Sequence, residues 1–142
     1  MPFNKAKGSK AERELLQLFT DNSWRAVRVA GSGVNDNSPC DLLAAKAGRK
    51  GYVVEAKSSK KPIIYISKAQ IEDFILFSQI IGLTPVIAAR FNYEGWLFLT
   101  PEQLRDTGGA WAIDLKDAKL KGKKFAQFFE AGATSLSDNS FV

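Results

Sequence analysis

The sequence contains no histidine and a single cysteine, Cys40, in 142 residues. Without histidine, the Ser-His-Asp triad and the usual zinc sites are excluded. Since one cysteine cannot form a disulfide within the chain, we expect a reducing compartment, the cytoplasm. Any metal ion would have to be bound by carboxylate and carbonyl oxygens, which favours a hard cation, Mg²⁺ or its substitute Mn²⁺.

Long apolar runs are also missing. No stretch approaches the ~18 apolar residues of a membrane span, and the polar, basic N-terminus lacks the apolar segment of a secretory signal. We therefore expect no membrane contact. The length, 45% hydrophobic residues and 25% charged residues are those of one globular domain. We expect this domain over residues 1–132, with a flexible basic arm at 1–9 and a loose tail at 133–142.

Positive charge is concentrated in the first part of the chain. Residues 1–61 contain 12 Lys and Arg against 6 Asp and Glu, a net charge of +6. Residues 62–142 contain 8 against 9, a net charge of −1. A polyanion would bind the basic half. The alternative is a surface excess that only keeps the protein soluble.

Hydrophobic periodicity and turn residues predict alternating helices and strands. Helices are expected at 10–21, 68–81 and 117–131. Strands are expected at 25–30, 42–45, 52–57, 62–67, 85–91, 95–99 and 112–115. Residues 31–39 are rich in Gly, Ser and Asn and should form a loop. This order predicts an α/β fold with a central mixed β-sheet flanked by helices.

The expected helix at 68–81 carries more apolar residues than one buried stripe can hold. It must bury a second surface, either under a second sheet layer or in a homodimer interface. We favour the homodimer because so small a chain has few other elements to cover the helix. Phe74, Phe77 and Ile81 are placed in this interface.

Glu55 and Lys57 end an apolar strand and share one of its faces, roughly 7 Å apart. This arrangement suits phosphodiester cleavage, in which a carboxylate binds a metal ion and a lysine offsets transition-state charge. Asp41, at the start of the preceding strand, would supply a second carboxylate, and Ala56 its backbone carbonyl. The alternative is an exposed charged pair at a strand end, with Asp41 as a turn residue.

The pattern from Asp41 to Glu55-Ala56-Lys57 resembles the signature of the PD-(D/E)xK nucleases. Flanking residues narrow the resemblance to the archaeal-type Holliday junction resolvases. The matching runs are KGSKAEREL at 7–15, VRVAGSG at 27–33, VVEAK at 53–57, FS at 77–78 and GWLF at 95–98. The resemblance covers roughly residues 5–100, and residues 101–142 are not covered convincingly.

The resemblance implies a restriction-endonuclease-like fold and a homodimer that resolves four-way DNA junctions by paired symmetric nicks with Mg²⁺, in recombination and repair. The implied catalytic residues are Glu12, Ser32, Asp41, Glu55 and Lys57. The implied metal ligands are Glu12, Asp41, Glu55 and the backbone carbonyl of Ala56. The expected DNA-binding residues are Lys5, Lys7, Lys10, Arg13, Arg28, Lys60 and Lys61.

Helix geometry supports Glu12 over its neighbour Glu14. Glu12 lies on the same face as the apolar residues of its helix and points toward the sheet, whereas Glu14 lies about 200° away on the helical wheel. Ser32, between two glycines, is otherwise a turn residue. The family's proline before the aspartate is displaced, because Cys40 intervenes between Pro39 and Asp41, and Asp36 is a weaker rival to Asp41.

Further alternatives concern the tail and the activity of the domain. Related resolvases can carry a C-terminal peptide for a sliding clamp, but the tail at 133–142 matches its spacing imperfectly, and a disordered end is the favoured interpretation. The same nuclease core would also suit a duplex- or mismatch-directed enzyme. A DNA-binding scaffold without cleavage is a third possibility, but a pure binder has no need of buried carboxylates that face a polyanion.

Overall fold

A computed structural model describes residues 2–29 and 38–130, with the side chains from Lys10 onward. The helices are α1 (Pro2–Asp21), α2 (Lys68–Ile81) and α3 (Leu115–Lys121), with a 3₁₀ turn η1 (Pro101–Gln103) and a π turn η2 (Ala126–Glu130). The strands are β1 (Arg25–Arg28), β2 (Leu42–Ala45), β3 (Tyr52–Ser59), β4 (Ile63–Ser67), β5 (Thr84–Phe91), β6 (Gly95–Leu99), β7 (Arg105–Asp106) and β8 (Ala110–Asp114).

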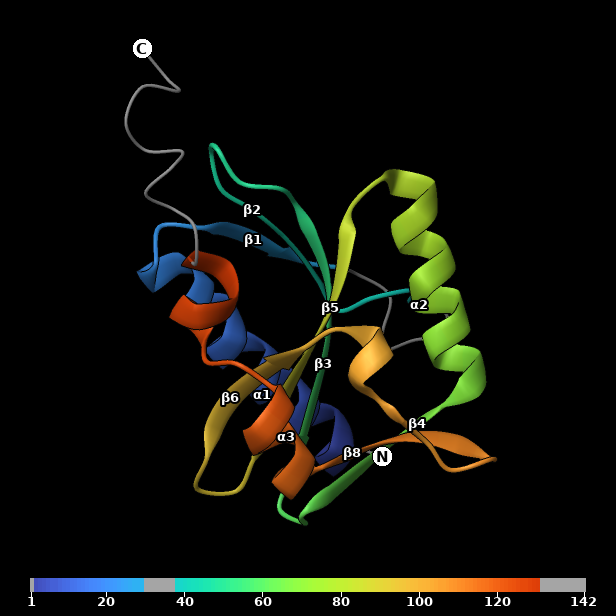
Figure 1. Ribbon diagram of the computed structural model, residues 1–142. Coiled ribbons are helices and arrows are strands. Elements are labelled where there is room, and N and C mark those ends of the chain that lie inside the picture. The colour runs from blue at the N-terminus through green and yellow to red at the C-terminus, as the bar shows by residue number, and fades with distance from the viewer. Residues whose placement is uncertain (1, 30–37, 131–142) are drawn as a thin grey trace.

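The central sheet has five strands in the order β1-β2-β3-β5-β6. It is mixed, because β3 and β5 are parallel while the other pairs are antiparallel. The parallel pair is connected through β4 and α2. Figure 1 shows α1 and the C-terminal turn on one face of the sheet and α2 on the other. The predicted α/β fold with a central mixed sheet is therefore confirmed.

A second, smaller sheet lies beside the first helix turn of α2. It contains three antiparallel strands in the order β4-β8-β7. The sequence predicted β4 and β8 as strands but not their separate sheet, and it missed β7, which has only two residues. Side-chain periodicity cannot detect so short a strand.

Alternation along β3 divides the interior into two cores, since successive residues of a strand point to opposite faces. Val53 packs toward α2 with Phe74 and Ile87. Val54 packs toward α1 with Phe19. Each core includes side chains of β3, so this central strand is packed on both of its faces. None of the described helices is long and apolar enough to cross a membrane.

The basic N-terminal segment, expected as an arm before the first helix, is itself helical. α1 begins at Pro2, eight residues before the expected start. Proline is tolerated in the first helical turn because its missing N–H has no intrahelical partner there. The alanine and lysines that follow favour helix strongly enough to continue it through Gly8.

The helix predicted at 117–131 is wrong in its extent. α3 ends at Lys121, and the chain then pairs with the edge of β6, where Phe98 and Lys123 exchange backbone hydrogen bonds of 2.8 and 3.0 Å. At Gly122, a Cβ atom would lie 2.5 Å from the carbonyl oxygen of Ala118, so a larger residue would not fit the end of α3. The crossing carries Phe125 and Phe129 to the α1 side of the sheet.

The burial of residues on α2 shows that one residue predicted for the dimer interface is wrong. Phe74 is fully buried within its own chain, in the core under α2, and therefore cannot contact a partner. Phe77 is half-buried and Ile81 is exposed, as are Leu76 and Ile80. The second sheet layer contacts α2 through β4 and β8, but it leaves this apolar side of the helix uncovered.

The aromatic core on the α1 side yields a stability prediction. The ring of Phe19 makes edge-on contacts with Trp24, Phe98, Phe125 and Phe129, at centroid distances of 5.9, 6.4, 5.1 and 5.2 Å. We expect Phe19→Ala to lower the free energy of unfolding by about 3–5 kcal/mol, because it leaves a cavity among these rings.

Urea denaturation of the two proteins measures this loss. Leu120→Ala is the control, since Leu120 is 77% exposed on α3 and its truncation should change the free energy by no more than about 0.5 kcal/mol. Equal unfolding midpoints for Phe19→Ala and Leu120→Ala would show that this cluster does not stabilise the fold.

Candidate active site

Asp41 and Glu55 meet where β2 separates from β3. Asp41 directly precedes β2, and its backbone N–H donates to the carbonyl oxygen of Val54 at 2.9 Å. Its side-chain Oδ2 accepts a hydrogen bond from the backbone N–H of Ala56 at 2.8 Å. Glu55, between these two β3 residues, is only 3% exposed. Glu55 is therefore a buried carboxylate with the partly buried Asp41 beside it, rather than half of an exposed charged pair with Lys57.

The carbonyl of Ala56 points toward the same place. In a strand, the N–H and C=O of one residue leave the same edge, and alternate residues face alternate neighbours. Val54 bonds to the β2 side, and Ser59, five residues later, bonds to the β5–β6 connection at Asn92. Ala56 therefore faces the β2 side, beyond Leu42, the first residue of β2. Its carbonyl oxygen joins the Asp41 carboxylate at this gap.

Both carboxylates resist ionisation. Burial, helped by the charge of Asp41, raises the pKa of Glu55 to about 8, against a lowering effect of Lys57. Burial also raises the pKa of Asp41 to about 6, opposed by the hydrogen bond from Ala56. Two buried carboxylates side by side cannot both hold a charge without a nearby cation. These oxygen donors therefore fit a hard divalent ion, although that ion must displace protons to bind.

Two further side chains contact Glu55 directly. The Nζ of Lys57 lies 3.7 Å from Oε2 of Glu55. The Nε2 of Gln70 donates a hydrogen bond of 2.6 Å to the same oxygen. Gln70 lies in the first turn of α2, where its backbone N–H donates to Oγ of the N-cap Ser67 at 3.1 Å.

Sequence reasoning missed Gln70. The available signal was the Ser67-Lys68-Ala69-Gln70 run, a serine followed three residues later by glutamine at the expected start of a helix. This spacing indicates a helix N-terminus. It does not indicate that the glutamine reaches across to a carboxylate on a strand 15 residues earlier, which depends on how α2 packs against β3.

Glu12 lies at the edge of the pair but is held by another residue. Its Oε1 accepts hydrogen bonds from Nε and Nη2 of Arg28 at 3.1 and 3.0 Å. Its charge still contributes to the raised pKa of Asp41 and of Glu55. Over residues 2–29 and 38–130, no three acidic side chains lie close enough together to hold a metal ion. Glu12 as the third metal ligand thus stays a prediction.

Glu14 also differs from its sequence interpretation. Its carboxylate is not merely solvated, because its Oε2 lies 2.7 Å from Nη1 of Arg90 on β5. This pair lies on the α1 side of the sheet and does not involve Asp41 or Glu55. The choice of Glu12 over Glu14 for the neighbourhood of the site agrees with these contacts.

The residues expected to bind DNA differ in their exposure and in their contacts. Lys10, Arg13, Lys60 and Lys61 are exposed, and Arg28 is paired with Glu12. The side chains of Lys5 and Lys7 lie outside the described residues, as do Ser32, Asp36 and the tail at 133–142. The predictions for these residues remain predictions.

Cys40, the residue that separates Pro39 from Asp41, has a packing role. Its side chain is buried in the core under α2, and burial beside Asp41 raises the pKa of its thiol to about 12. The thiol is therefore neutral and serves as a packing group. The inserted residue fills the core, and Asp41 still reaches β3.

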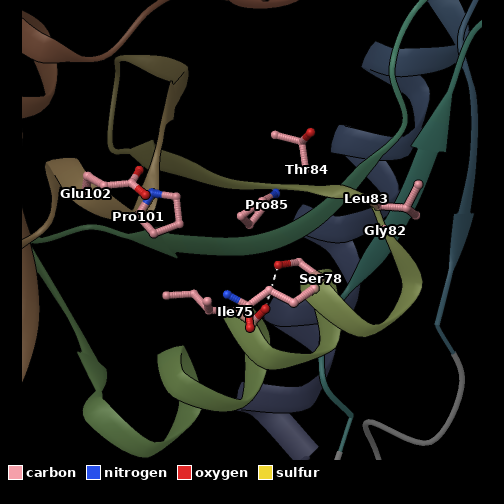
Figure 2. A pocket seen from close by; sticks show the side chains of 9 residues that line it. Ile75, Ser78, Gly82, Leu83, Thr84, Pro85, Pro101 and Glu102 are labelled. Atoms are coloured by element: carbon pink, nitrogen blue, oxygen red, sulfur yellow. Dashed lines mark hydrogen bonds between the residues drawn. The ribbon is translucent and has the colours of Figure 1, made fainter.

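An open hollow of about 410 Å³ lies away from the carboxylates, between the end of α2, the start of β5 and η1. Figure 2 shows Ile75 and Ser78 on one side of it and Pro85 and Pro101 on the other. No acidic residue of the candidate site lines it. The hollow instead borders the uncovered apolar side of α2.

The comparisons with known proteins agree on one family. Residues 3–135 match the family described as "Archaeal holliday junction resolvase (hjc)". The crossover junction endodeoxyribonuclease Hjc of Methanocaldococcus jannaschii is 43% identical over 111 residues, 76% of each chain. Its counterpart from Archaeoglobus fulgidus is 31% identical over 132 residues, 88% of this chain and 96% of the relative.

A solved structure supports the same assignment. The 1.6 Å structure of Archaeoglobus fulgidus Hjc, a Holliday junction resolvase, has a TM-score of 0.76 to this fold at 29% identity, covering 84% of this chain and 98% of that one. Sequence, fold and the buried carboxylate pair lead to one conclusion. The chain belongs to the archaeal Holliday junction resolvase (Hjc) family of endonucleases.

Proposed function

We propose that this endodeoxyribonuclease resolves four-way DNA junctions in the cytoplasm with Mg²⁺, using Asp41, Glu55 and Lys57 at the gap between β2 and β3. The observation that carries the proposal is the buried pair of carboxylates with raised pKa values beside one lysine. A pure DNA-binding scaffold would gain nothing from such a pair, since both groups repel phosphate when charged.

Asp41, Glu55 and the carbonyl of Ala56 would hold the metal ion, with Glu12 as a further ligand. A bound divalent ion would supply Lewis acidity toward a phosphoryl oxygen. It would also lower the pKa of a bound water molecule, so that this water can lose a proton near neutral pH. Mn²⁺ would fit the same oxygen donors.

The remaining side chains have separate tasks in this proposal. Lys57 offsets the negative charge that develops on the phosphate during attack. Gln70 orients the carboxylate of Glu55 through its 2.6 Å hydrogen bond. Arg28, paired with Glu12 at the rim of the site, is placed to bind a phosphate. Lys10, Arg13, Lys60 and Lys61, with Lys5, Lys7 and Ser32, complete the proposed DNA-contacting set.

Paired nicks require two active sites, and the uncovered side of α2 would join them in a homodimer. Leu76, Ile80 and Ile81 are 53%, 71% and 38% exposed, which is a large apolar surface for one helix. The neighbouring hollow (Figure 2) could receive a side chain of a second copy. In a two-fold dimer, each copy would offer the same helix and the same hollow.

Replacement of Glu55 tests the catalytic assignment. With Mg²⁺ and a synthetic four-way junction, we expect Glu55→Gln to cut at least about 100-fold more slowly than wild type, because the neutral amide cannot replace a metal-binding carboxylate. Junction binding without metal should persist, since Glu55 is buried and its charge opposes DNA. Gel analysis of single-turnover cleavage and a mobility-shift assay measure the two quantities.

Glu14→Gln is the matched control for this experiment. It makes the same chemical change on α1, where the carboxylate pairs with Arg90, and it should cut at close to the wild-type rate. Cleavage by Glu55→Gln at the rate of Glu14→Gln would refute the proposed site. If wild type cuts linear duplex but not junctions, the assignment as a nuclease stands and the proposed junction-resolving activity is refuted.

Gln70→Ala tests the positioning of Glu55. Loss of a side chain that orients a metal ligand typically weakens metal affinity by about 10–100-fold, so the Mg²⁺ concentration for half-maximal cleavage should rise by about this factor. Cleavage at saturating Mg²⁺ should recover much of its rate. Gln17→Ala, an exposed glutamine on α1 bonded to Asp21, is the control, and equal Mg²⁺ dependence of the two variants would argue against a positioning role.

The raised pKa values predict how metal-free stability depends on pH. Asp41 and Glu55 bind protons more tightly in the folded chain than in the unfolded one, where their pKa values are near 3.8 and 4.5. Their contribution to stability is therefore fully present below about pH 4 and is lost as pH rises toward about pH 8. The charged groups that face them, Lys57 and Glu12, are included in these shifts.

Thermal denaturation in EDTA measures this effect. Between about pH 5 and about pH 8, wild type should lose several degrees of melting temperature relative to Glu55→Gln, whose amide does not titrate. Adding Mg²⁺ at about pH 8 should raise the melting temperature of wild type more than that of Glu55→Gln. Parallel pH curves for the two proteins, with and without Mg²⁺, would contradict the assignment of these carboxylates.

A further inference from the structure

The connection between β5 and β6 presents an unusual tyrosine. The N–H of Glu94 donates to the carbonyl oxygen of Phe91 at 3.1 Å and closes a tight turn. Tyr93, the third residue of this turn, has φ of 67°, a conformation for which turns normally use Gly or Asn. Its side chain is 97% exposed, so no packing contact compensates for the unfavourable backbone. A bulky residue held this way at a surface suggests a function.

The turn that carries Tyr93 is fixed from three directions. The N–H of Asn92 donates to the carbonyl oxygen of Ser59, at the end of β3, at 3.1 Å. The Nζ of Lys124 donates to the carbonyl oxygen of Glu94 at 3.2 Å. The Nζ of Lys119 lies 3.2 Å from the carboxylate of Glu94. The ring therefore projects from a braced support rather than from a loose loop.

Lysines surround this tyrosine. The β3–β4 turn begins at Ser59, beside Asn92, and its last residue, Pro62, accepts a hydrogen bond of 2.8 Å from the N–H of Leu115 at the start of α3. Figure 1 shows the hairpin tip, the β3–β4 turn and the start of α3 at the same end of the molecule. We define the hairpin patch as Tyr93 with the exposed lysines Lys60, Lys61, Lys116, Lys119 and Lys124.

We propose that the hairpin patch binds the sugar–phosphate backbone of the duplex arm that leads away from the cut, with the Tyr93 ring packed against a deoxyribose and the lysines on phosphates. This inference rests on the proposed function and deepens it. Charge complementarity selects DNA, since the five lysines of the patch outnumber the acidic residues beside them, Glu94, which is already paired with Lys119, and Asp117 on α3. Lysines and tyrosine are common backbone contacts that position a protein on a duplex.

The length of β3 between Glu55 and Ser59 separates the hairpin patch from the active site. Ser59 lies four residues beyond Glu55 on β3, which corresponds to about 13 Å of strand. At about 3.4 Å per base pair, the patch lies roughly four or more base pairs from the scissile phosphate. A contact at this distance can place an arm without taking part in the reaction.

Binding of a four-way junction in EDTA, at several salt concentrations, tests the inference. We expect Tyr93→Gly to raise the dissociation constant about five- to tenfold, the low end of the range typical for loss of an aromatic contact to nucleic acid. Tyr93→Phe, which keeps the ring, should stay within about twofold of wild type. Lys116→Gln, which removes one phosphate contact, should reduce the salt slope of log K by about 0.9.

Two controls separate binding from folding. Glycine suits the positive φ at position 93, so Tyr93→Gly should melt no lower than wild type. Lys50→Gln removes an exposed lysine from the β2–β3 turn, at the opposite end of the molecule (Figure 1), and should leave the salt slope unchanged.

An unchanged dissociation constant for Tyr93→Gly, or an unchanged slope for Lys116→Gln, overturns this inference and leaves the nuclease assignment intact. Failure of wild type to bind the junction would instead contradict the proposed function itself.

Discussion

The separation of β2 from β3 at Asp41 is the constraint on which the site depends. As long as the strands pair, their backbone groups satisfy each other, and no space exists for a ligand. At Asp41 the side-chain Oδ2 replaces the missing strand and accepts the Ala56 N–H at 2.8 Å. This one bond places a carboxylate beside Glu55 and leaves the Ala56 carbonyl directed at the same gap. A shift of one residue in β3 would send Glu55 to the opposite face.

Features that depend on the residues of one short segment could be predicted from the sequence. The limits of α2 and β6 and the pairing of β5 with β6 follow from periodicity and turn residues. The same alternation put Glu55 and Lys57 on one face, and the helical wheel put Glu12 near the site. Gln70 and the separation of β4 and β8 into a second sheet depend on contacts between distant segments. No local pattern encodes those contacts, because each residue type there suits several environments equally well.

Two of the wrong predictions, the interface role of Phe74 and the extent of the last helix, share a physical cause. Phe74 was assigned to a dimer interface because α2 is apolar on more than one side, but periodicity cannot tell which side faces the sheet. The residues on both sides of Gly122 favour helix, so the sequence does not mark the end of α3. Edge pairing between Phe98 and Lys123 outweighed that preference. In both cases tertiary packing chose between options that local propensity left nearly equal.

The charges of the site link metal binding to DNA binding. With Asp41 and Glu55 both ionised, the gap would repel a phosphate, and burial makes this repulsion stronger than it would be at the surface. A proton or a cation must therefore be present whenever DNA occupies the site. Since coupling between two ligands is reciprocal, a junction that binds better to the metal-loaded chain must also tighten the metal. In the proposed function, the lysines and arginines around the gap would attract DNA, while the buried acids would admit its phosphate only together with a proton or a metal ion.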